Sequence, residues 1–213
     1  MKMKCVVATV VVSLGLCTGA AQAKNFCGEL KNGFGPFDYR NAGSLPAELA
    51  IVQDHHFTSD VENNVGGSEG YIGGDLDYTL RAFPNHVRAL ASMSRQSILE
   101  KNLKPRGATY PVDCYFLRAF QFAPDDGMPH AVYGNHLQAT GKPDLAMKEF
   151  QRAAALDPDN ATINYNAGLA YFNAKQYDKA LMHAKKAYAK DFPLPGLKNK
   201  LIAAGRWSDK APE

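Results

Sequence analysis

The stretch Gly134–Pro158, GNHLQATGKPDLAMKEFQRAAALDP, decides the fold, because its key residues return after 34 positions. The small residues that recur in this way are Gly134 and Gly168, Ala146 and Ala180, and Ala153 and Ala187. A period of this length is typical of stacked helical hairpins, each of which buries its apolar side only against its neighbours. We therefore expect an all-helical protein.

The turn between hairpins recurs as well. It reads APDD at 123–126, DPDN at 157–160 and, upstream, FPNH at 83–86. Proline cannot continue a helix, and an Asp or Asn after it can accept hydrogen bonds from the unpaired N–H groups of the next helix. Each turn is therefore expected to end one helix and to cap the next.

These features resemble the tetratricopeptide-repeat (TPR) family over about residues 87–205. In 127–160 the family pattern is matched by Gly134, Ala146, Phe150, Ala153 and Pro158. In 161–194 it is matched by Gly168, Tyr171, Ala180 and Ala187, although Ala184 replaces the usual large residue and Pro193 comes one position late. The resemblance implies an all-α, TPR-type solenoid of helical hairpins, with Gly134 packed against Phe150.

The expected divisions follow from the spacing of the turns. A third repeat lies upstream, but Pro84 and Pro124 are 40 residues apart instead of 34, so a loop at 101–110 should separate helices at 85–99 and 111–122. We expect repeats at 87–126, 127–160 and 161–194. An N-terminal extension, 24–86, should contain an irregular segment, helices near 47–53, 58–64 and 75–83, and a flexible loop at Gly66–Gly74. Residues 195–213 should form a cap helix and a tail.

The first 23 residues are typical of a cleavable secretory signal. Lys2 and Lys4 precede an apolar run, and small residues end at Ala23. The run covers only 5–16, and a membrane-spanning helix needs about 20 residues. Cys17 follows Leu16, whereas lipid attachment normally follows a small residue, so cleavage after Ala23 is favoured over lipid anchoring. We expect a periplasmic or secreted protein with no transmembrane segment.

Cleavage would leave Cys27 and Cys114 out of four cysteines, in an oxidising compartment. A disulfide between them is therefore expected. A redox pair would need a C-x-x-C spacing or a local activating group, which the sequence lacks. The bond should instead fasten the N-terminal segment to the repeats, and closing so long a loop contributes about 4 kcal/mol in the chain-entropy model.

Charge and motifs argue against several classes of function. Without Lys2 and Lys4, 22 basic residues face 21 acidic ones, so there is no electrostatic case for binding nucleic acid. The sequence has no G-x-S-x-G motif and no H-E-x-x-H spacing, and the Gly66–Gly74 loop lacks the lysine of a P-loop. The six histidines are interpreted as surface or capping residues. We expect no catalysis, no cofactor and no metal.

The TPR resemblance also implies a concave groove, lined by one face of each first helix, that binds a peptide or protein. Its residues here would be Arg88, Arg95, Asn135, Gln138, Tyr165, Asn166, Leu169, Phe172 and Asn173. Ala91 and Ala131 stand where a clamp for a C-terminal carboxylate needs lysines, so that clamp is absent. Tyr165, Leu169 and Phe172 could equally pack between repeats.

The function expected from these features is that of a non-catalytic adaptor or assembly factor in the cell envelope. Segments 35–40, 56–62 and 75–86 resemble a group of exported bacterial TPR proteins, which supports export and fold but no mechanism. One alternative is a metal or enzymatic site built by Asp54, His55, His56 and Glu62. Another is a structural subunit that self-assembles through its convex face. The extension could also fill the groove.

Overall fold

The structure is a computed structural model that describes residues 27–208. The expected signal segment 1–23, with Cys17, lies outside the described residues. Within 27–208 the regular structure is entirely helical, as expected. The N-terminal elements are η1 (Tyr39–Ser44), α2 (Pro46–His55), α3 (Ser59–Glu62) and α4 (Ile72–Ala82). They are followed by α5 (Val87–Leu99), α6 (Val112–Phe122), α7 (Gly127–Ala139), α8 (Pro143–Leu156), α9 (Ala161–Asn173), α10 (Tyr177–Tyr188) and α11 (Gly196–Ala203).

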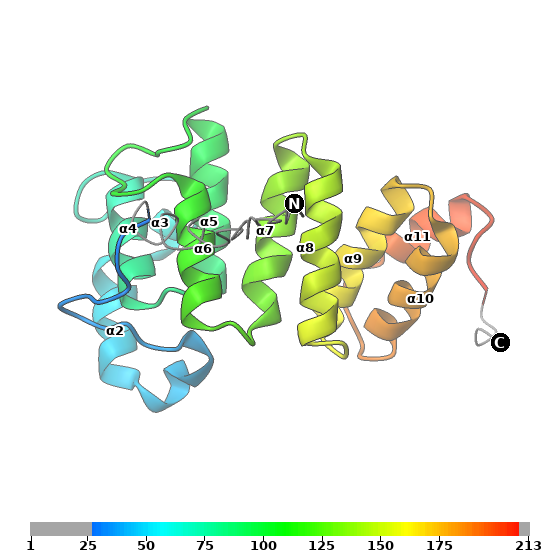
Figure 1. Cartoon of the computed structure of the whole chain (residues 1–213), viewed down its shortest axis with the longest axis horizontal. Helices are drawn as coiled ribbons and strands as arrows, with labels where there is room; N and C mark the ends of the chain where they lie inside the picture. The colour runs from blue at the N-terminus through cyan, green and yellow to red at the C-terminus, as the bar shows by residue number, and fades with distance from the viewer. Residues whose placement is uncertain (1–26, 209–213) are drawn as a thin grey trace, which may run out of the picture.

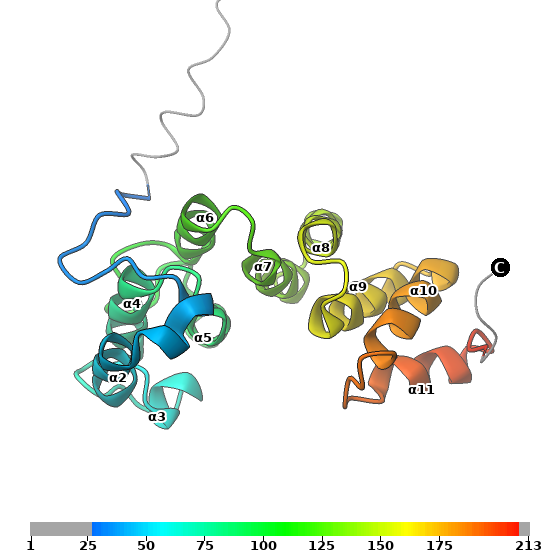
Figure 2. The same ribbon diagram turned by 90° about the horizontal axis from the view of Figure 1, so that it is seen from below.

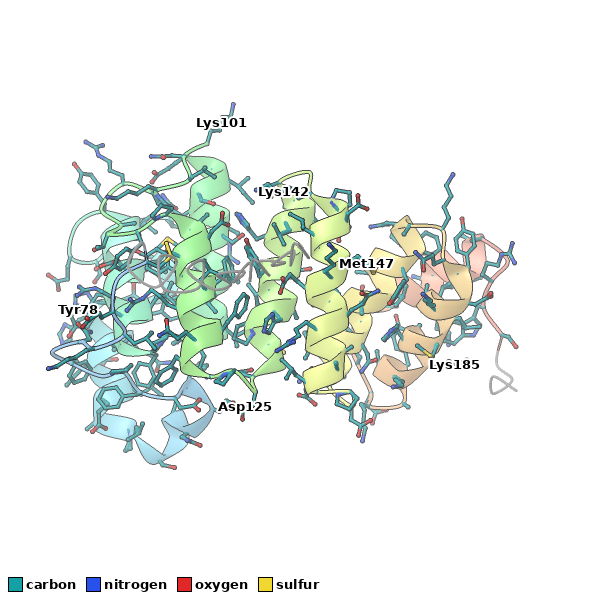
Figure 3. All side chains as sticks on the ribbon, in the orientation of Figure 1. Tyr78, Lys101, Asp125, Lys142, Met147 and Lys185 are labelled. Atoms are coloured by element: carbon teal, nitrogen blue, oxygen red, sulfur yellow. A yellow bond between two sulfur atoms is a disulfide. The ribbon has the colours of Figure 1, made fainter. Side chains whose placement is uncertain are left out.

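The helices are stacked along one long axis, with α2–α4 at one end and α11 at the other (Figure 1). Figure 2 shows the stack as an arch, in which α6 and α8 lie on the outer side and α5, α7 and α9 on the inner side. Helices α3 and α11 flank the inner side at its two ends. Figure 3 shows that side chains fill the space between successive helices.

Close packing within the hairpins depends on glycine. Helix α7 packs against α8, and α9 packs against α10. A Cβ atom on Gly134 would lie 2.7 Å from Phe150 Cε1, which confirms the expected pair. At Gly168 the neighbour is different, because a Cβ atom there would lie 2.5 Å from Leu197 Cδ2. Ala184 leaves space where the family has a large residue. Leu197 of the cap helix α11 therefore packs against Gly168.

The altered repeat packs differently from the two regular ones. Helices α5 and α6 approach each other less closely than α7 and α8, and α5 packs instead against α4 and α7. The loop between α5 and α6 is fixed to α4 by Asp77, which accepts hydrogen bonds from the Thr109 N–H at 3.1 Å and the Tyr115 hydroxyl at 2.5 Å. The longer loop therefore lets α4 take up part of the space beside α5.

The three turns cap the helices that follow them. Asp126 and Asn160 accept N–H groups at the starts of α7 and α9, as expected. In the first turn the cap is His86, whose Nδ1 accepts from the Ala89 N–H at 3.2 Å. Asn85 is fully buried beside it and donates to Asp38 and Asp126. It thereby connects the N-terminal segment to the turn before α7.

The N-terminal segment is fastened to the stack by the expected disulfide between Cys27 and Cys114, 87 residues apart. Arg118 on α6 is also buried there and donates to the carbonyl oxygens of Cys27 at 3.1 Å and Glu29 at 2.7 Å. Further along, the Phe37 N–H donates to the Ala82 carbonyl at 2.8 Å. The segment therefore lies against α6 and α4.

The buried core consists of separate clusters along the axis. The N-terminal cluster includes large side chains such as Leu76, Leu80, Phe83 and Phe116. The C-terminal cluster depends on Leu197 and Leu201 of α11 together with several alanines. In the described part of the chain, every helix is too short or too polar to cross a membrane.

Candidate functional site

The inner side of the arch carries a groove between α7 and α9. It has a volume of about 370 Å³, and its lining comes from three helices: Asn135, Gln138 and Ala139 of α7, Asn166, Leu169 and Asn173 of α9, and Lys200 of α11. A second hollow of about 270 Å³ lies between α5 and α7. The two hollows share Asn135 and Ala139, so they form one surface, which we call the inner groove.

Five of the residues expected to bind a partner line this groove. They are Asn135, Gln138, Asn166, Leu169 and Asn173. Four of the five carry amide groups, each of which can donate and accept hydrogen bonds. The lining residues of both hollows, all within 27–208, include no Asp or Glu. The groove therefore offers amide groups and positive charge to a ligand.

The two arginines expected in the groove are occupied by the N-terminal extension. Arg88 pairs with Glu62 of α3, and its Nε donates to Glu62 Oε1 at 2.6 Å. This pairing lowers the pKa of Glu62. Arg95 lines the hollow beside α5, but its Nε donates to Asn64 Oδ1 at 3.0 Å and its guanidinium also reaches Ser92 Oγ at 2.8 Å. Both arginines therefore hold α3 and the residues after it against α5.

The aromatic residues expected in the groove lie at its C-terminal edge. Tyr165 is only 9% exposed and stacks on Phe192, with 4.4 Å between ring centroids. Phe172 is half-buried beside Tyr177, and the Lys200 ammonium lies 5.6 Å from its ring centroid. Tyr165 is thus a packing residue, whereas Leu169 lines the groove.

Lys200 is the groove residue that the expected site lacks. It belongs to α11, which follows the last complete hairpin and occupies the position of a further first helix. Extending the 34-residue period by one more step aligns Lys200 with Asn166, so the repeat contains a signal that could have found it. Lys200 is exposed and brings a positive charge to the part of the groove that Asn166 and Leu169 line.

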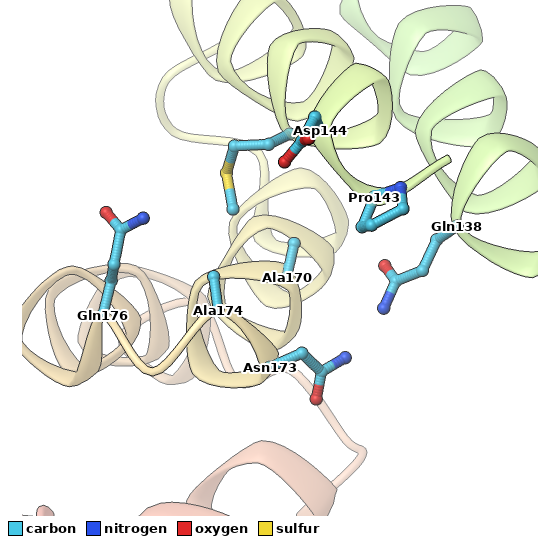
Figure 4. A pocket seen from close by; sticks show the side chains of 8 residues that line it. Gln138, Pro143, Asp144, Ala170, Asn173, Ala174 and Gln176 are labelled. Atoms are coloured by element: carbon cyan, nitrogen blue, oxygen red, sulfur yellow. The ribbon is translucent and has the colours of Figure 1, made fainter. Parts of the chain in front are cut away.

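A third pocket, of about 300 Å³, opens at the edge formed by the α7–α8 and α9–α10 turns. Figure 4 shows Gln138 of α7 and Asn173 of α9 at this pocket, together with Pro143 and Gln176. Gln138 and Asn173 also line the inner groove. A bound chain that leaves the groove past these two residues would therefore enter the edge pocket.

Two of the four residues of the alternative metal site, His56 and Glu62, have other partners. His56 Nδ1 lies 3.0 Å from Asp75 Oδ1, and the His56 ring stacks on Tyr78. Glu62 pairs with Arg88. Asp75 also accepts the Ser68 N–H at 2.7 Å. The expected Gly66–Gly74 loop ends at residue 71, just before α4 begins, and is tied to α4 by this bond. Within 27–208 no three His, Cys, Asp or Glu residues are grouped as metal ligands would be.

The interpretation of the histidines as surface or capping residues is wrong for three of them. His130 is buried with its Nδ1 2.7 Å from Glu149 Oε2, and His183 is buried with its Nδ1 2.8 Å from Asn164 Oδ1. Asn164 and His183 stand 34 residues after His130 and Glu149, so both repeats contain a polar pair at the same two positions. The histidine is on the first helix in one repeat and on the second helix in the other. The 34-residue alignment contains this signal.

The third buried histidine lies between α5 and α7. His136 Nδ1 is 2.9 Å from Ser94 Oγ, and the His136 ring lies near Phe116 and Tyr133. Burial lowers the pKa of both His136 and His183. These two histidines are therefore neutral hydrogen-bonding groups of the helix interfaces at pH 7.

A family model supports the repeat assignment. Residues 134–175, which include the second half of α7 and all of α8 and α9, match the family model described as TPR repeat. A crystal structure of MamA protein is 18% identical, with a TM-score of 0.49, and the match covers 73% of this chain and 79% of that one. A second MamA structure, AMB-1, is 18% identical, with a TM-score of 0.40, over 72% of this chain and 86% of that one.

No curated protein matches this chain in sequence. The local TPR match and the antiparallel hairpins α7–α8 and α9–α10 agree with each other. The fold is therefore an all-α, TPR-type helical solenoid.

Proposed function

We propose that this chain is an exported, non-catalytic adaptor or assembly factor, which binds an extended segment of a partner protein in the inner groove. TPR repeats are typical of scaffolds for protein–protein interaction. The observation that carries the proposal is the continuous row of amide side chains from Asn135 to Asn173, with Lys200 beside it and no carboxylate in the lining.

The chemistry of the groove fits a peptide backbone. An extended chain presents an N–H and a C=O group at each residue, about 3.3 Å apart along its length. Amides of Asn135 and Asn166 can pair with both kinds of group, which gives affinity with little dependence on the partner's sequence. Lys200 favours a partner that carries an acidic side chain at that point.

Export is part of the proposal and has two supports. Residues 1–23 have the layout of a cleavable signal. The Cys27–Cys114 disulfide is compatible with an oxidising compartment such as the periplasm. Trypsin treatment of intact and osmotically shocked cells would separate a periplasmic protein, cleaved only after shock, from one retained inside the cell.

Photo-crosslinking in cells tests the binding site. A photoreactive residue at Asn166 should capture a partner protein, because Asn166 lines the groove. The same residue at Lys148, which is exposed on α8, is the matched control and should capture none. An Asn135→Ala and Lys200→Ala variant should weaken capture from Asn166. Equal capture from both positions, or capture unaffected by the two substitutions, would contradict the proposed site.

A further inference from the structure

Charge is distributed unevenly along the stack. Residues 27–100 contain ten Asp or Glu and five Lys or Arg, residues 101–173 contain seven of each, and residues 174–208 contain two acidic and eight basic residues. The first and last of these segments form the opposite ends of the long axis (Figure 1). The described chain is therefore acidic at one end and basic at the other, although its total charge is small.

The acidic end combines exposed carboxylates with exposed apolar side chains. Asp54 of α2 and Asp60 of α3 are exposed, and within 27–208 neither carboxylate has a hydrogen bond or ion pair. Ile51 on α2 is 44% exposed, and Val65 just after α3 is 75% exposed. This end therefore has the composition of a small apolar contact bordered by negative charge.

The basic end has the complementary composition. Lys186 and Lys190 are exposed on and just after α10, and in the described chain their ammonium groups have no ion pair. Leu194 is 55% exposed, and Ile202 of α11 is 53% exposed. This end therefore combines positive charge with apolar side chains that are open to contact.

The exposure of Ile202 has a structural reason. It stands 34 residues after Gly168, at the position that faces the second helix in a complete hairpin, and no helix follows α11 within 27–208. Helix α11 is in the position of a first helix, but within 27–208 it has no second helix to cover Ile202. At the corresponding position of α7, Gly134 is covered by Phe150 of α8.

We propose that copies of this chain associate head to tail, with the α2–α3 end of one copy against the α10–α11 end of the next. One chain carries both complementary surfaces at opposite ends, so the contact can be repeated from copy to copy. An unrelated acidic protein would match only the basic end. Opposite charges would orient the two copies, and the apolar side chains would supply the buried area.

Two charge-reversal variants test the contact. Asp54→Lys with Asp60→Lys leaves residues 27–100 with eight acidic and seven basic residues, which removes most of the negative charge of that end. Lys186→Glu with Lys190→Glu leaves residues 174–208 with six basic and four acidic residues, which weakens the positive charge of the other end. None of these four side chains makes a hydrogen bond or ion pair within 27–208, so folding should be unchanged by circular dichroism. Sedimentation velocity at low salt should show self-association of the wild type and an association constant lowered about tenfold or more in each variant alone.

Mixing the two variants is the decisive measurement. In the mixture, the lysines introduced at positions 54 and 60 of one chain meet the glutamates introduced at positions 186 and 190 of the other, so the mixture should associate more strongly than either variant by itself. Lys148→Glu with Arg152→Glu, on the exposed face of α8 in the charge-balanced middle, is the matched control and should associate like the wild type.

Salt supplies a second readout. The Debye length is about 10 Å at 0.1 M salt, so association should weaken as salt rises. A wild type that stays monomeric at low salt, a mixture no more associated than its components, or a control as impaired as the end variants would each overturn the proposal.

Discussion

His86 illustrates how one buried side chain can make the stability of this protein depend on pH. Its ring is fully buried, stacks on Tyr39 with 3.8 Å between centroids, and contacts the Phe57 ring edge-on. Its Nδ1 accepts from the Ala89 N–H, while Nε2 has no hydrogen-bond partner among residues 27–208. Burial lowers the pKa of His86 from 6.5 to about 3.

This lowered pKa predicts a loss of stability in acid. The unfolded chain binds a proton at His86 near pH 6.5, whereas the folded chain binds it only near pH 3, so unfolding takes up a proton between these values. The free energy of unfolding should therefore fall as pH falls from about 6.5, by about 1 kcal/mol per pH unit from this residue. Urea denaturation at a series of pH values measures this slope.

Substitution isolates the contribution of His86. His86→Asn keeps a capping side chain of the kind found at Asp126 and Asn160 but removes the titrating group. The variant should be less stable at pH 7, because the ring contacts are lost, and its stability should depend less on pH. The exposed His55→Asn variant should keep the wild-type slope. Equal slopes in the wild type and His86→Asn would show that His86 is not the cause.

Gly134→Val is a second residue-scale prediction. Side-chain atoms at this position would overlap the Phe150 ring, because even a Cβ atom lies 2.7–2.9 Å from three of its atoms. We expect a loss of about 2 kcal/mol in the free energy of unfolding by overpacking. Ala155→Val, on the exposed face of α8, should cost only a few tenths of a kcal/mol. Phe150→Leu in the Gly134→Val background should recover part of this stability. If Gly134→Val and Ala155→Val lower the free energy of unfolding equally, the close contact between Gly134 and Phe150 does not determine the effect.

The sequence predicts residues whose role is set within one turn or one hairpin. The caps Asp126 and Asn160 and the Gly134–Phe150 contact belong to this group. The engagement of Arg88 by Glu62 could not be predicted, because it requires α3 to fold back onto α5. Lys200 lies on a helix outside the complete repeats, so only an extension of the 34-residue period by one more step would have predicted its place in the groove.

At the scale of single elements, the N-terminal segment depends on contacts distant in sequence. The disulfide to Cys114 and the two carbonyl hydrogen bonds from Arg118 fix residues 27–29 on α6. Arg118 is buried, and this burial lowers its pKa despite the carbonyl oxygens around it. The segment therefore supplies polar groups that the buried guanidinium needs.

Removing the disulfide should destabilise the protein substantially. Cys27→Ser with Cys114→Ser should lower the free energy of unfolding by about 4 kcal/mol, mainly because the unfolded chain regains freedom. Chemical denaturation with and without dithiothreitol measures the effect. Reduced wild type should match the double variant, and the double variant should not respond to dithiothreitol. Unchanged stability in the variant would show that Arg118 and the apolar contacts hold the segment without the bond.

Helix positions were easier to predict than helix pairing. The expected helices at 85–99 and 111–122 are α5 and α6, and those near 47–53 and 75–83 are α2 and α4. Proline and apolar spacing mark these segments directly. The closer packing of α5 on α4 than on α6 was not predicted, because it follows from the loop fixed by Asp77, a contact between distant segments.

At the scale of the whole molecule, stability should differ between the two ends of the stack. The N-terminal core contains Leu76, Phe83 and Phe116 and is closed by the disulfide. The C-terminal core contains many alanines and depends on α11 for Leu197 and Leu201. In a solenoid each repeat is stabilised mainly by its neighbours, so the ends can open independently.

Hydrogen exchange should therefore be fastest at the C-terminal end. We expect amides of α10 and α11 to exchange faster than those of α4 and α6 under native conditions, measured by mass spectrometry of peptides. Leu197→Ala should increase exchange in α9 and α10 but leave α4 unchanged, because Leu197 packs beside Gly168 and belongs to the C-terminal cluster. Uniform protection along the chain would indicate a single cooperative unit instead.

The reversed polar pairs of the two regular repeats also bear on how the chain avoids misfolding. Correct pairing sets His130 against Glu149 and Asn164 against His183. If α7 paired with α10, two imidazole rings would compete for a space shaped for one ring and a smaller side chain. If α9 paired with α8, two smaller side chains would leave part of that space empty. Similar repeats risk exchanging helices during folding, and this mismatch in volume favours the correct partners.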